Sequence, residues 1–222
     1  MMWQVLTVTP GLQVGALIIG LAVAIIFHEV AHGYVALLLG DPTAKYAGRL
    51  TFNPLKHIDM WGTIIVPLFL LMLPGGFLFG WAKPVPVNYY NLRSGKYGPL
   101  LVALAGPATN LLLLIVASLL ARVSPADTAL QFLFGSIALI NGWLMMFNLI
   151  PVPPLDGSKI LYVWLENRPD ILGWLEQYGF YLLIALMVFG GGILRLASIP
   201  GVWLVNALAG PEVLYQVISN SL

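Results

Sequence analysis

An apolar run at residues 14–39 contains ionisable side chains near its middle. The run is long enough to cross a lipid bilayer as a helix, which takes about 20 mostly apolar residues, yet it includes the sequence FHEVAH at 27–32. Hydrocarbon solvates ionisable groups poorly, so such groups within a membrane helix are costly and usually functional. The run therefore predicts a membrane helix whose two histidines and glutamate face protein or water rather than lipid.

Further apolar segments follow at 99–121, 129–150, 178–198 and 202–218, the last of them after the turn signal Pro200-Gly201. Only 9% of the 222 residues are charged, against about 25% in a soluble domain. The first residues, MMWQVLTVTPG, lack the charged region of a cleaved signal peptide, so we expect the first segment to be retained. The sequence thus predicts an all-α polytopic membrane protein of about five or six transmembrane segments, with residues 1–222 forming a single integral-membrane domain.

Positive charge predicts how the chain is oriented. Eight of the ten lysines and arginines lie in three polar stretches, at 40–60, 81–98 and 151–177. Such loops stay in the cytoplasm, so we expect a multi-pass protein of the cell (inner or plasma) membrane with its N-terminus outside. The apolar segment 61–80 must then leave and re-enter the cytoplasmic side. A re-entrant hairpin turning at the Pro-Gly-Gly sequence 74–76 satisfies this requirement, whereas a single crossing does so only if the following segment also returns through the membrane.

The spacing within FHEVAH is that of a metal-binding helix. His28 and His32 are four residues apart and share one helix face, and Glu29 adjoins the first of them. This is the HExxH arrangement, in which two imidazoles bind zinc and the glutamate is the general base. The alternative is that both histidines make interhelical hydrogen bonds and Glu29 is a protonated structural carboxyl. Three ionisable groups within five residues, at ligand spacing, favour the metal.

A catalytic zinc takes three protein ligands, and the chain has no cysteine to offer. His57, in NPLKHID, is expected at the membrane surface as an interfacial polar residue. Asp156 is the better candidate, because it ends the proline-rich stretch FNLIPVPPLDG (147–157), which cannot stay helical and lies at the same depth as the histidines. Its alternative role is an ordinary turn aspartate before Gly157.

Together these motifs resemble the site-2 protease family of intramembrane zinc metalloproteases. Residues 28–32 fit the family's zinc-binding motif, and 148–157 fit its second motif, in which an asparagine precedes the ligand aspartate by eight residues. Residues 106–110 fit a Gly-Pro-x-x-Asn stretch on the helix between them. The sequence WAKPVPVN at 81–88 is similar to the strand-forming region of the short bacterial members, and nothing resembles the PDZ or CBS domains that many relatives carry.

The resemblance implies a role for each motif residue. It implies one Zn²⁺ per chain, bound by His28, His32 and Asp156, with Glu29 as the base. It also implies that Asn148 helps to hold the substrate or the tetrahedral intermediate. Substrate selection is then expected to come from the membrane core or from a partner.

Two further elements have open alternatives. Asn110 either contacts the substrate or makes a structural interhelical hydrogen bond. Residues Pro84, Val85, Pro86 and Val87 favour extended backbone, and we expect them to form a β-strand that pairs with an unwound substrate. The alternative is an interfacial loop that only shields the site. The sequence does not decide between the two roles of Asn110 or between the two roles of residues 84–87.

The predicted activity is hydrolysis of peptide bonds within or near transmembrane segments of membrane-protein substrates, as in regulated intramembrane proteolysis. One alternative is a non-enzymatic metal-transport or metal-sensing protein that uses the same ligands, and another is an inactive relative that only binds helices. Neither has a chemical need for Glu29 beside the first ligand. The expected partners are a transmembrane protein or peptide and the lipid bilayer. The net charge of +1 gives no sign of nucleic-acid binding, and the oligomeric state is not predicted.

Overall fold

The computed structural model describes residues 9–72 and 80–220, and this part of the chain is helical without any strand. Five long helices dominate it: α1 (Pro10–Leu38), α4 (Gly98–Val123), α5 (Ala129–Asn148), α7 (Pro169–Phe189) and α8 (Gly191–Ala209). All five are long and apolar enough to cross a membrane. Short helices accompany them: α2 (Thr43–Tyr46), α3 (Val66–Leu71), α6 (Ser158–Trp164) and α9 (Pro211–Ser219). The prediction of an all-α polytopic membrane protein is confirmed.

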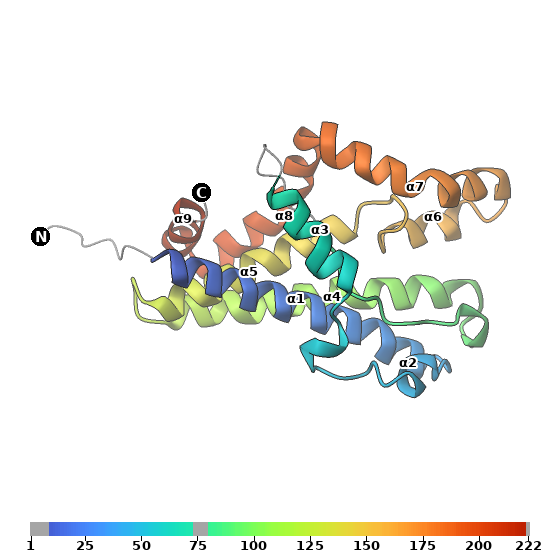
Figure 1. Cartoon of the computed structure of the whole chain (residues 1–222), viewed down its shortest axis with the longest axis horizontal. Coiled ribbons are helices and arrows are strands. Elements are labelled where there is room, and N and C mark those ends of the chain that lie inside the picture. The colour runs from blue at the N-terminus through green and yellow to red at the C-terminus, as the bar shows by residue number, and fades with distance from the viewer. Residues whose placement is uncertain (1–8, 73–79, 221–222) are drawn as a thin grey trace, which may run out of the picture.

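Small residues let the long helices approach closely, as is common between helices in membranes. Helices α1, α4, α5 and α8 lie side by side (Figure 1). A Cβ on Gly201 of α8 would lie 2.9 Å from the carbonyl oxygen of Gly142 in α5, so the two backbones are in contact there. An apolar cluster fills the space between α4, α5, α8 and α9, formed by Leu114, Ala117, Ala121, Ala138, Val205, Ala209 and Val213.

Helices α7 and α8 together make a single passage along the length of the bundle. Glu166, just before α7, pairs with Lys96, just before α4, at 2.7 Å. Helix α8 starts beside the end of α5, where Leu194 and Ile150 line the same small cavity. It finishes beside the end of α4, where Arg122 donates to the carbonyl of Leu208 at 3.3 Å. We call the end where α4 and α7 begin the "site end" of the bundle. Helix α7 runs from there toward the middle, and α8 continues to the "far end", which holds both described chain termini (Figure 1).

The predicted boundaries of the last two segments were wrong. Residues 178–198 straddle the junction between α7 and α8 at Gly190, and residues 202–218 combine the end of α8 with α9. Pro200, expected to begin a turn, lies inside α8, because packing of the following Gly201 on α5 holds the helix together. The actual break is at Gly210, whose φ of +101° suits glycine, followed by Pro211 at the start of α9.

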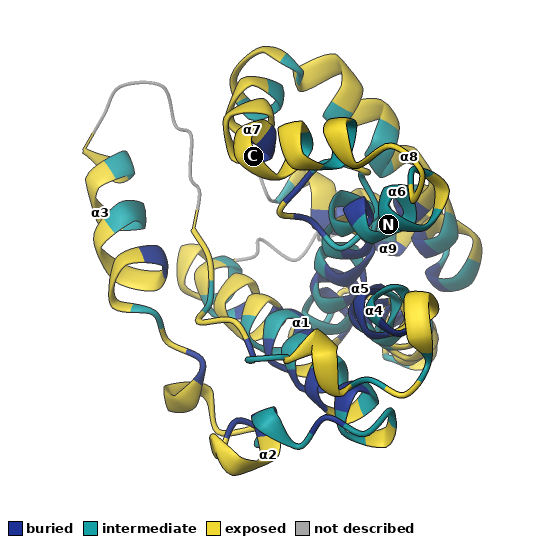
Figure 2. Cartoon of the chain, turned by 90° about the vertical axis from the view of Figure 1, so that its right-hand side faces the viewer, coloured by how far each residue is buried: buried dark blue, intermediate teal, exposed yellow. Residues whose placement is uncertain are grey.

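The apolar segment predicted as a re-entrant hairpin leaves and returns at one place. A six-residue π-helix (Met60–Ile65) leads into α3, and the returning backbone N–H of Trp81 donates to the carbonyl of Gly62 at 3.0 Å. We call residues 57–72 and 80–88 the hairpin segment. Its predicted turn at 74–76 lies outside the described residues. Figure 2 shows α3 standing apart from the bundle; none of its residues is buried, and Leu68 and Phe69 are exposed.

Candidate active site

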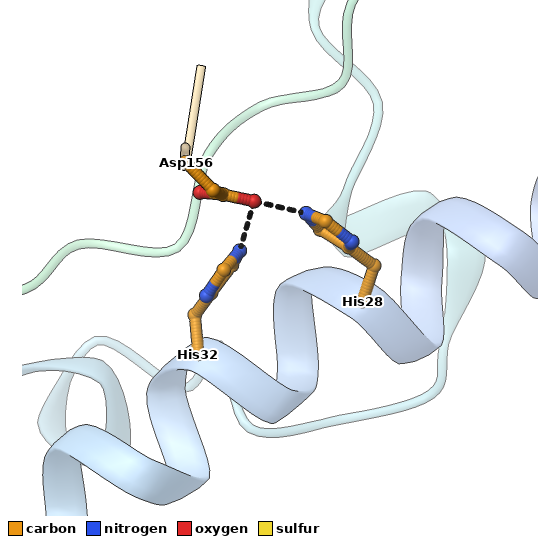
Figure 3. Close-up of side chains that lie close together, drawn as sticks. All are labelled: His28, His32 and Asp156. Carbon is orange, nitrogen blue, oxygen red and sulfur yellow. Dashed lines mark ion pairs between the residues drawn. The ribbon is translucent and has the colours of Figure 1, made fainter. Parts of the chain in front are cut away.

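Both histidines of FHEVAH turn one nitrogen to a neighbouring helix and the other to a common point. The Nδ1 atom of His32 lies 2.7 Å from the carbonyl oxygen of Val102 in α4, and Nδ1 of His28 lies 2.6 Å from Oδ1 of Asn110. A backbone carbonyl only accepts hydrogen bonds, so Nδ1 of His32 carries the proton and Nε2 is left with a lone pair in the neutral ring. Both Nε2 atoms point to the side of α1 where Asp156 lies (Figure 3).

A tight loop after α5 carries Asp156 back to the histidines. The backbone N–H of Gly157 donates to the carbonyl of Asn148, the last residue of α5, at 2.7 Å. A Cβ at Gly157 would collide with the carbonyl of Leu149, so only glycine fits this closure. The loop places Oδ2 of Asp156 at 3.1 Å from Nε2 of His28 and at 3.4 Å from Nε2 of His32 (Figure 3).

The residues that are present fit a zinc ion. The three ligand atoms all lie within 4.8 Å of one another. Zinc bonds of about 2.0–2.1 Å in a tetrahedron put ligand atoms about 3.3 Å apart, and the two Asp156 distances of 3.1 and 3.4 Å bracket that value. Direct charge-assisted hydrogen bonds are shorter, about 2.7–2.9 Å. Three acceptor atoms converge only around a cation, and these spacings favour a metal ion over a shared proton.

The carboxyl group of Asp156 is ionised at neutral pH. Burial raises the pKa of this carboxyl, but hydrogen bonds and positive charge from the two adjacent imidazoles in their protonated form lower it by more, and the resulting pKa is about 2. Its Oδ2 atom is buried without a hydrogen bond of normal geometry. A buried carboxylate oxygen is costly unless a cation or a donor faces it, so this oxygen is suited to a metal ligand.

Gly106 in α4 leaves the space that the imidazoles occupy. A Cβ at this position would lie 2.5 Å from Cε1 of His28 and 2.6 Å from Nε2 of His32. Real side chains do not approach that closely, so any residue larger than glycine would displace the ligands. This gives the Gly-Pro-x-x-Asn sequence a physical role that the sequence did not reveal: its glycine leaves room for the two imidazoles and its asparagine contacts His28.

Glu29 is held by the hairpin segment. Its Oε2 atom accepts a hydrogen bond of 2.7 Å from the backbone N–H of Val85, whose side chain is buried against Gly33 of α1. The N–H of Lys83 donates to the carbonyl of His57 at 2.9 Å, and the carbonyl of Lys83 accepts from Arg49 at 2.6 Å. Residues 81–88 thus run past the glutamate that adjoins the first ligand.

The expected β-strand at 84–87 is not paired in a sheet. Residues 80–88 have no regular secondary structure, because no second strand among the described residues lies beside them. Lys83 and Val85 each precede a proline, and this restricts both to extended backbone. The segment is extended like a β-strand, but no second strand pairs with it among the described residues.

The remaining candidates fall in different places. Asn110 is fully buried, and its Nδ2 donates to Ala24 O and to Oδ1 of Asn141, a geometry that favours the interhelical role over contact with a substrate. Asn148 donates to Leu144 O at 3.1 Å at the start of the Asp156 loop. His57, expected at the interface, is buried with its Nε2 on Thr51 O at 2.8 Å and is not part of the metal cluster.

A cation lies beside the site where the hairpin segment ends. The Nζ atom of Lys159, three residues after Asp156, lies 5.5 Å from the ring centre of Tyr89 and 4.1 Å from that of Tyr162. Burial lowers the pKa of this lysine, and the nearby carboxylates of Glu176 and Asp156 oppose that effect. The lysine thus connects α6 to the turn that follows residues 81–88.

Sequence reasoning missed two residues that shape the site. Asn141 of α5 is fully buried and bonds to Asn110. Asp41, after α1, is also fully buried and accepts from the backbone of Thr43 and Asn88 and from the side chain of Asn91. An amide in the apolar segment 129–150 was the available signal for Asn141, whereas nothing in the sequence near Asp41 indicates its distant partners.

Comparison with known proteins identifies the family of this chain. Residues 120–190, which include Asp156, match the model of peptidase family M50. The chain is 38% identical over 184 residues to "Putative zinc metalloprotease YwhC" of Bacillus subtilis, covering 78% of this chain and 80% of that protein. The chain belongs to the site-2 protease family, peptidase family M50.

More distant relatives carry similar names. "Putative zinc metalloprotease Rip2" of Mycolicibacterium smegmatis is 28% identical over 188 residues, 82% of this chain and 71% of that protein. "Putative zinc metalloprotease MJ0611" of Methanocaldococcus jannaschii is 30% identical over 164 residues, 70% of this chain and 76% of that protein. No solved structure matches the chain at comparable significance. Membership of this family of zinc metalloproteases and the apolar helices identify a multi-pass membrane metalloprotease.

Proposed function

We propose that this site-2 protease homologue hydrolyses peptide bonds within or near transmembrane segments of membrane proteins, using one Zn²⁺ held by His28, His32 and Asp156. The observation that carries the proposal is the convergence of three ligand atoms within 4.8 Å of one another beside Gly106, with Asp156 Oδ2 at 3.1 and 3.4 Å from the two imidazole nitrogens. The described residues hold this one cluster of potential metal ligands. A metal-transport path would need further polar groups across the membrane, so the transport alternative has less support.

Glu29 is the proposed general base. A zinc ion bound here would acidify a water molecule and polarise the scissile carbonyl. Glu29 takes the proton of the attacking water and delivers it to the leaving amine. The Val85 N–H holds one carboxylate oxygen, and the other is proposed to carry out this transfer. The amide of Asn148 is proposed to help hold the substrate or the tetrahedral intermediate.

Residues 84–87 are proposed to bind the substrate backbone. In an extended segment, the N–H and C=O groups of successive residues point to opposite sides. The N–H groups of Lys83 and Val85 face the protein, so the backbone carbonyl groups of Pro84 and Pro86 point to the opposite side. Prolines have no N–H, and this free edge offers only carbonyl acceptors. A substrate helix must unwind to expose its N–H groups, and these acceptors can then hold the unwound backbone.

The test compares wild type with Glu29→Gln in detergent. Zinc content and cleavage of a panel of single-spanning substrates are measured on the same preparations. We expect near-stoichiometric zinc in both proteins and cleavage by wild type alone. Absence of zinc from wild type would contradict the metal site. Zinc-dependent metal uptake by wild-type proteoliposomes, without cleavage of any substrate, would favour the transport alternative.

The site end of the bundle is proposed to face the cytoplasm, because most of the positive charge lies there. The chain has no cysteine, so single cysteines can be labelled with membrane-impermeant reagents. Lys56→Cys should react from the cytoplasmic side, and Ala126→Cys and Glu212→Cys from the outside. Labelling of Glu212→Cys from the cytoplasmic side would mean that α7 and α8 each cross the membrane, contrary to the single passage described above.

A further inference from the structure

Asn141 is a buried amide in the middle of α5 that does not contact the metal cluster itself. Its Nδ2 donates to the carbonyl of Ile137, one turn earlier, at 2.8 Å. Its Oδ1 accepts from Nδ2 of Asn110 in α4 at 3.0 Å. Oδ1 of Asn110 in turn lies 2.6 Å from Nδ1 of His28 in α1. One line of hydrogen bonds therefore joins three helices and ends at a proposed zinc ligand.

The hydrogen bond from Asn141 to Ile137 fixes which atom donates and which accepts in every other hydrogen bond of this line. The carbonyl of Ile137 can only accept, so the NH₂ group of Asn141 must face it and the Asn141 oxygen must face Asn110. Asn110 then turns its own NH₂ toward Asn141 and toward Ala24 O, which is 3.3 Å away. The remaining oxygen of Asn110 faces His28. His28 must donate from Nδ1 and keeps its Nε2 lone pair for the metal.

We propose that Asn141 is a positioning residue of the metal centre, because it orients the amide that sets the tautomer of His28. The inference rests on the proposed zinc site. His32 needs no such residue, since its Nδ1 faces the carbonyl of Val102 directly, and a backbone carbonyl cannot rotate. The amide of Asn110 can rotate.

Loss of Asn141 removes the closer of the two acceptors that face the NH₂ group of Asn110. Only the longer contact to Ala24 O then opposes rotation of the amide. A rotated amide presents NH₂ to Nδ1 of His28 and forces the imidazole proton onto Nε2. That proton occupies the position of the metal bond, so zinc affinity falls.

The first experiment measures zinc retention against a competing chelator in the purified full-length protein. Asn141→Ala, and Asn141→Leu with its volume restored, should bind zinc about 10- to 100-fold more weakly than wild type, the usual effect of removing an outer-shell partner. Ser136→Ala is the matched control, because within the described part of the chain this buried hydroxyl on the same helix bonds only to Phe132 O. It should retain wild-type affinity.

The second experiment separates orientation of the amide from general packing. Asn110→Asp presents an acceptor oxygen to His28 in either orientation. In that background, Asn141→Ala should change zinc affinity by less than about twofold, although it costs at least about tenfold in wild type. An equal loss in both backgrounds would show a packing role and overturn the inference.

The remaining outcomes distinguish this inference from the zinc site. Folded Asn141 variants that bind zinc like wild type would overturn the inference alone. Absence of zinc from wild type would overturn the zinc site, and the inference with it.

Discussion

The metal cluster and the hairpin segment meet at Glu29 but are held in place in different ways. The two histidines of the proposed site lie on the packed helix α1, against Gly106 of α4 and next to buried amides, and Asp156 lies on a short closed loop after α5. The hairpin segment is held at its base by hydrogen bonds to polar groups such as Arg49, and α3 stays exposed. Regions with few buried contacts open at lower cost than packed cores. The comparison indicates that the proposed metal centre is rigid and that the proposed substrate-binding element beside it can shift.

The largest effect is expected from filling the space beneath the ligands. Gly106→Val should reduce zinc affinity and cleavage by about 100-fold or more, the upper end of what outer-shell changes cost, because its Cβ would overlap both imidazoles. Gly15→Ala on α1 is the control, since nothing lies within 4 Å of its added methyl group. Zinc retention and cleavage are measured together. Wild-type zinc binding by Gly106→Val would show that the ligands are less rigidly packed than the comparison requires.

A smaller effect, confined to cleavage, is expected from the hairpin segment. Replacing residues 84–87 by a Gly/Ser stretch should lower cleavage of a matched substrate by about tenfold, a loss of about 1.4 kcal/mol in binding the reacting complex. Zinc content should stay unchanged, because no ligand is touched. Unchanged cleavage would leave the segment as a shield of the site and remove the proposed pairing with the substrate.

The smallest effect on cleavage at neutral pH is expected from Asp41, which accepts a hydrogen bond from the backbone of Asn88 at the end of the hairpin segment. The Asp41 carboxylate is buried, and donors from Thr43, Asn91 and Asn88 face it. Asp41→Asn should lower the free energy of unfolding by about 2 kcal/mol, the scale of hydrogen bonds to a charged group, and change cleavage by less than about threefold. Thermal unfolding in detergent measures the first effect. If Asp41→Asn lost as much free energy of zinc binding as of folding, Asp41 would be part of the metal centre.

The stability that the Asp41 carboxylate contributes depends on pH in a definite direction. Burial raises the pKa of the Asp41 carboxyl, but the hydrogen bonds from Thr43, Asn91 and Asn88 outweigh it, and the pKa is lower than usual. A lowered pKa in the folded protein means that the stabilisation is complete above the ordinary aspartate pKa of about 3.9 and is lost as the pH falls through the folded value. The difference in stability between wild type and Asp41→Asn should therefore shrink only in strong acid.

Local patterns in the sequence determined the helical membrane class and the chemistry offered for metal binding. The four-residue spacing of His28 and His32 fixes them on one helix face, whatever the rest of the chain does. The prolines before Asp156 rule out a helix, and this made a returning loop foreseeable. The prolines at 84 and 86 likewise dictated extended backbone at Val85.

Tertiary structure decided what these local elements meet. The path of α7 and α8 depends on Gly201 packing against Gly142, a contact between residues far apart in the chain. The buried line from Asn141 to His28 joins three helices, and the bond from Val85 to Glu29 spans 56 residues. A sequence pattern reports which face a residue takes on its own helix or strand. Which distant group lies opposite that face is set by how the helices pack, and packing depends on the whole chain at once.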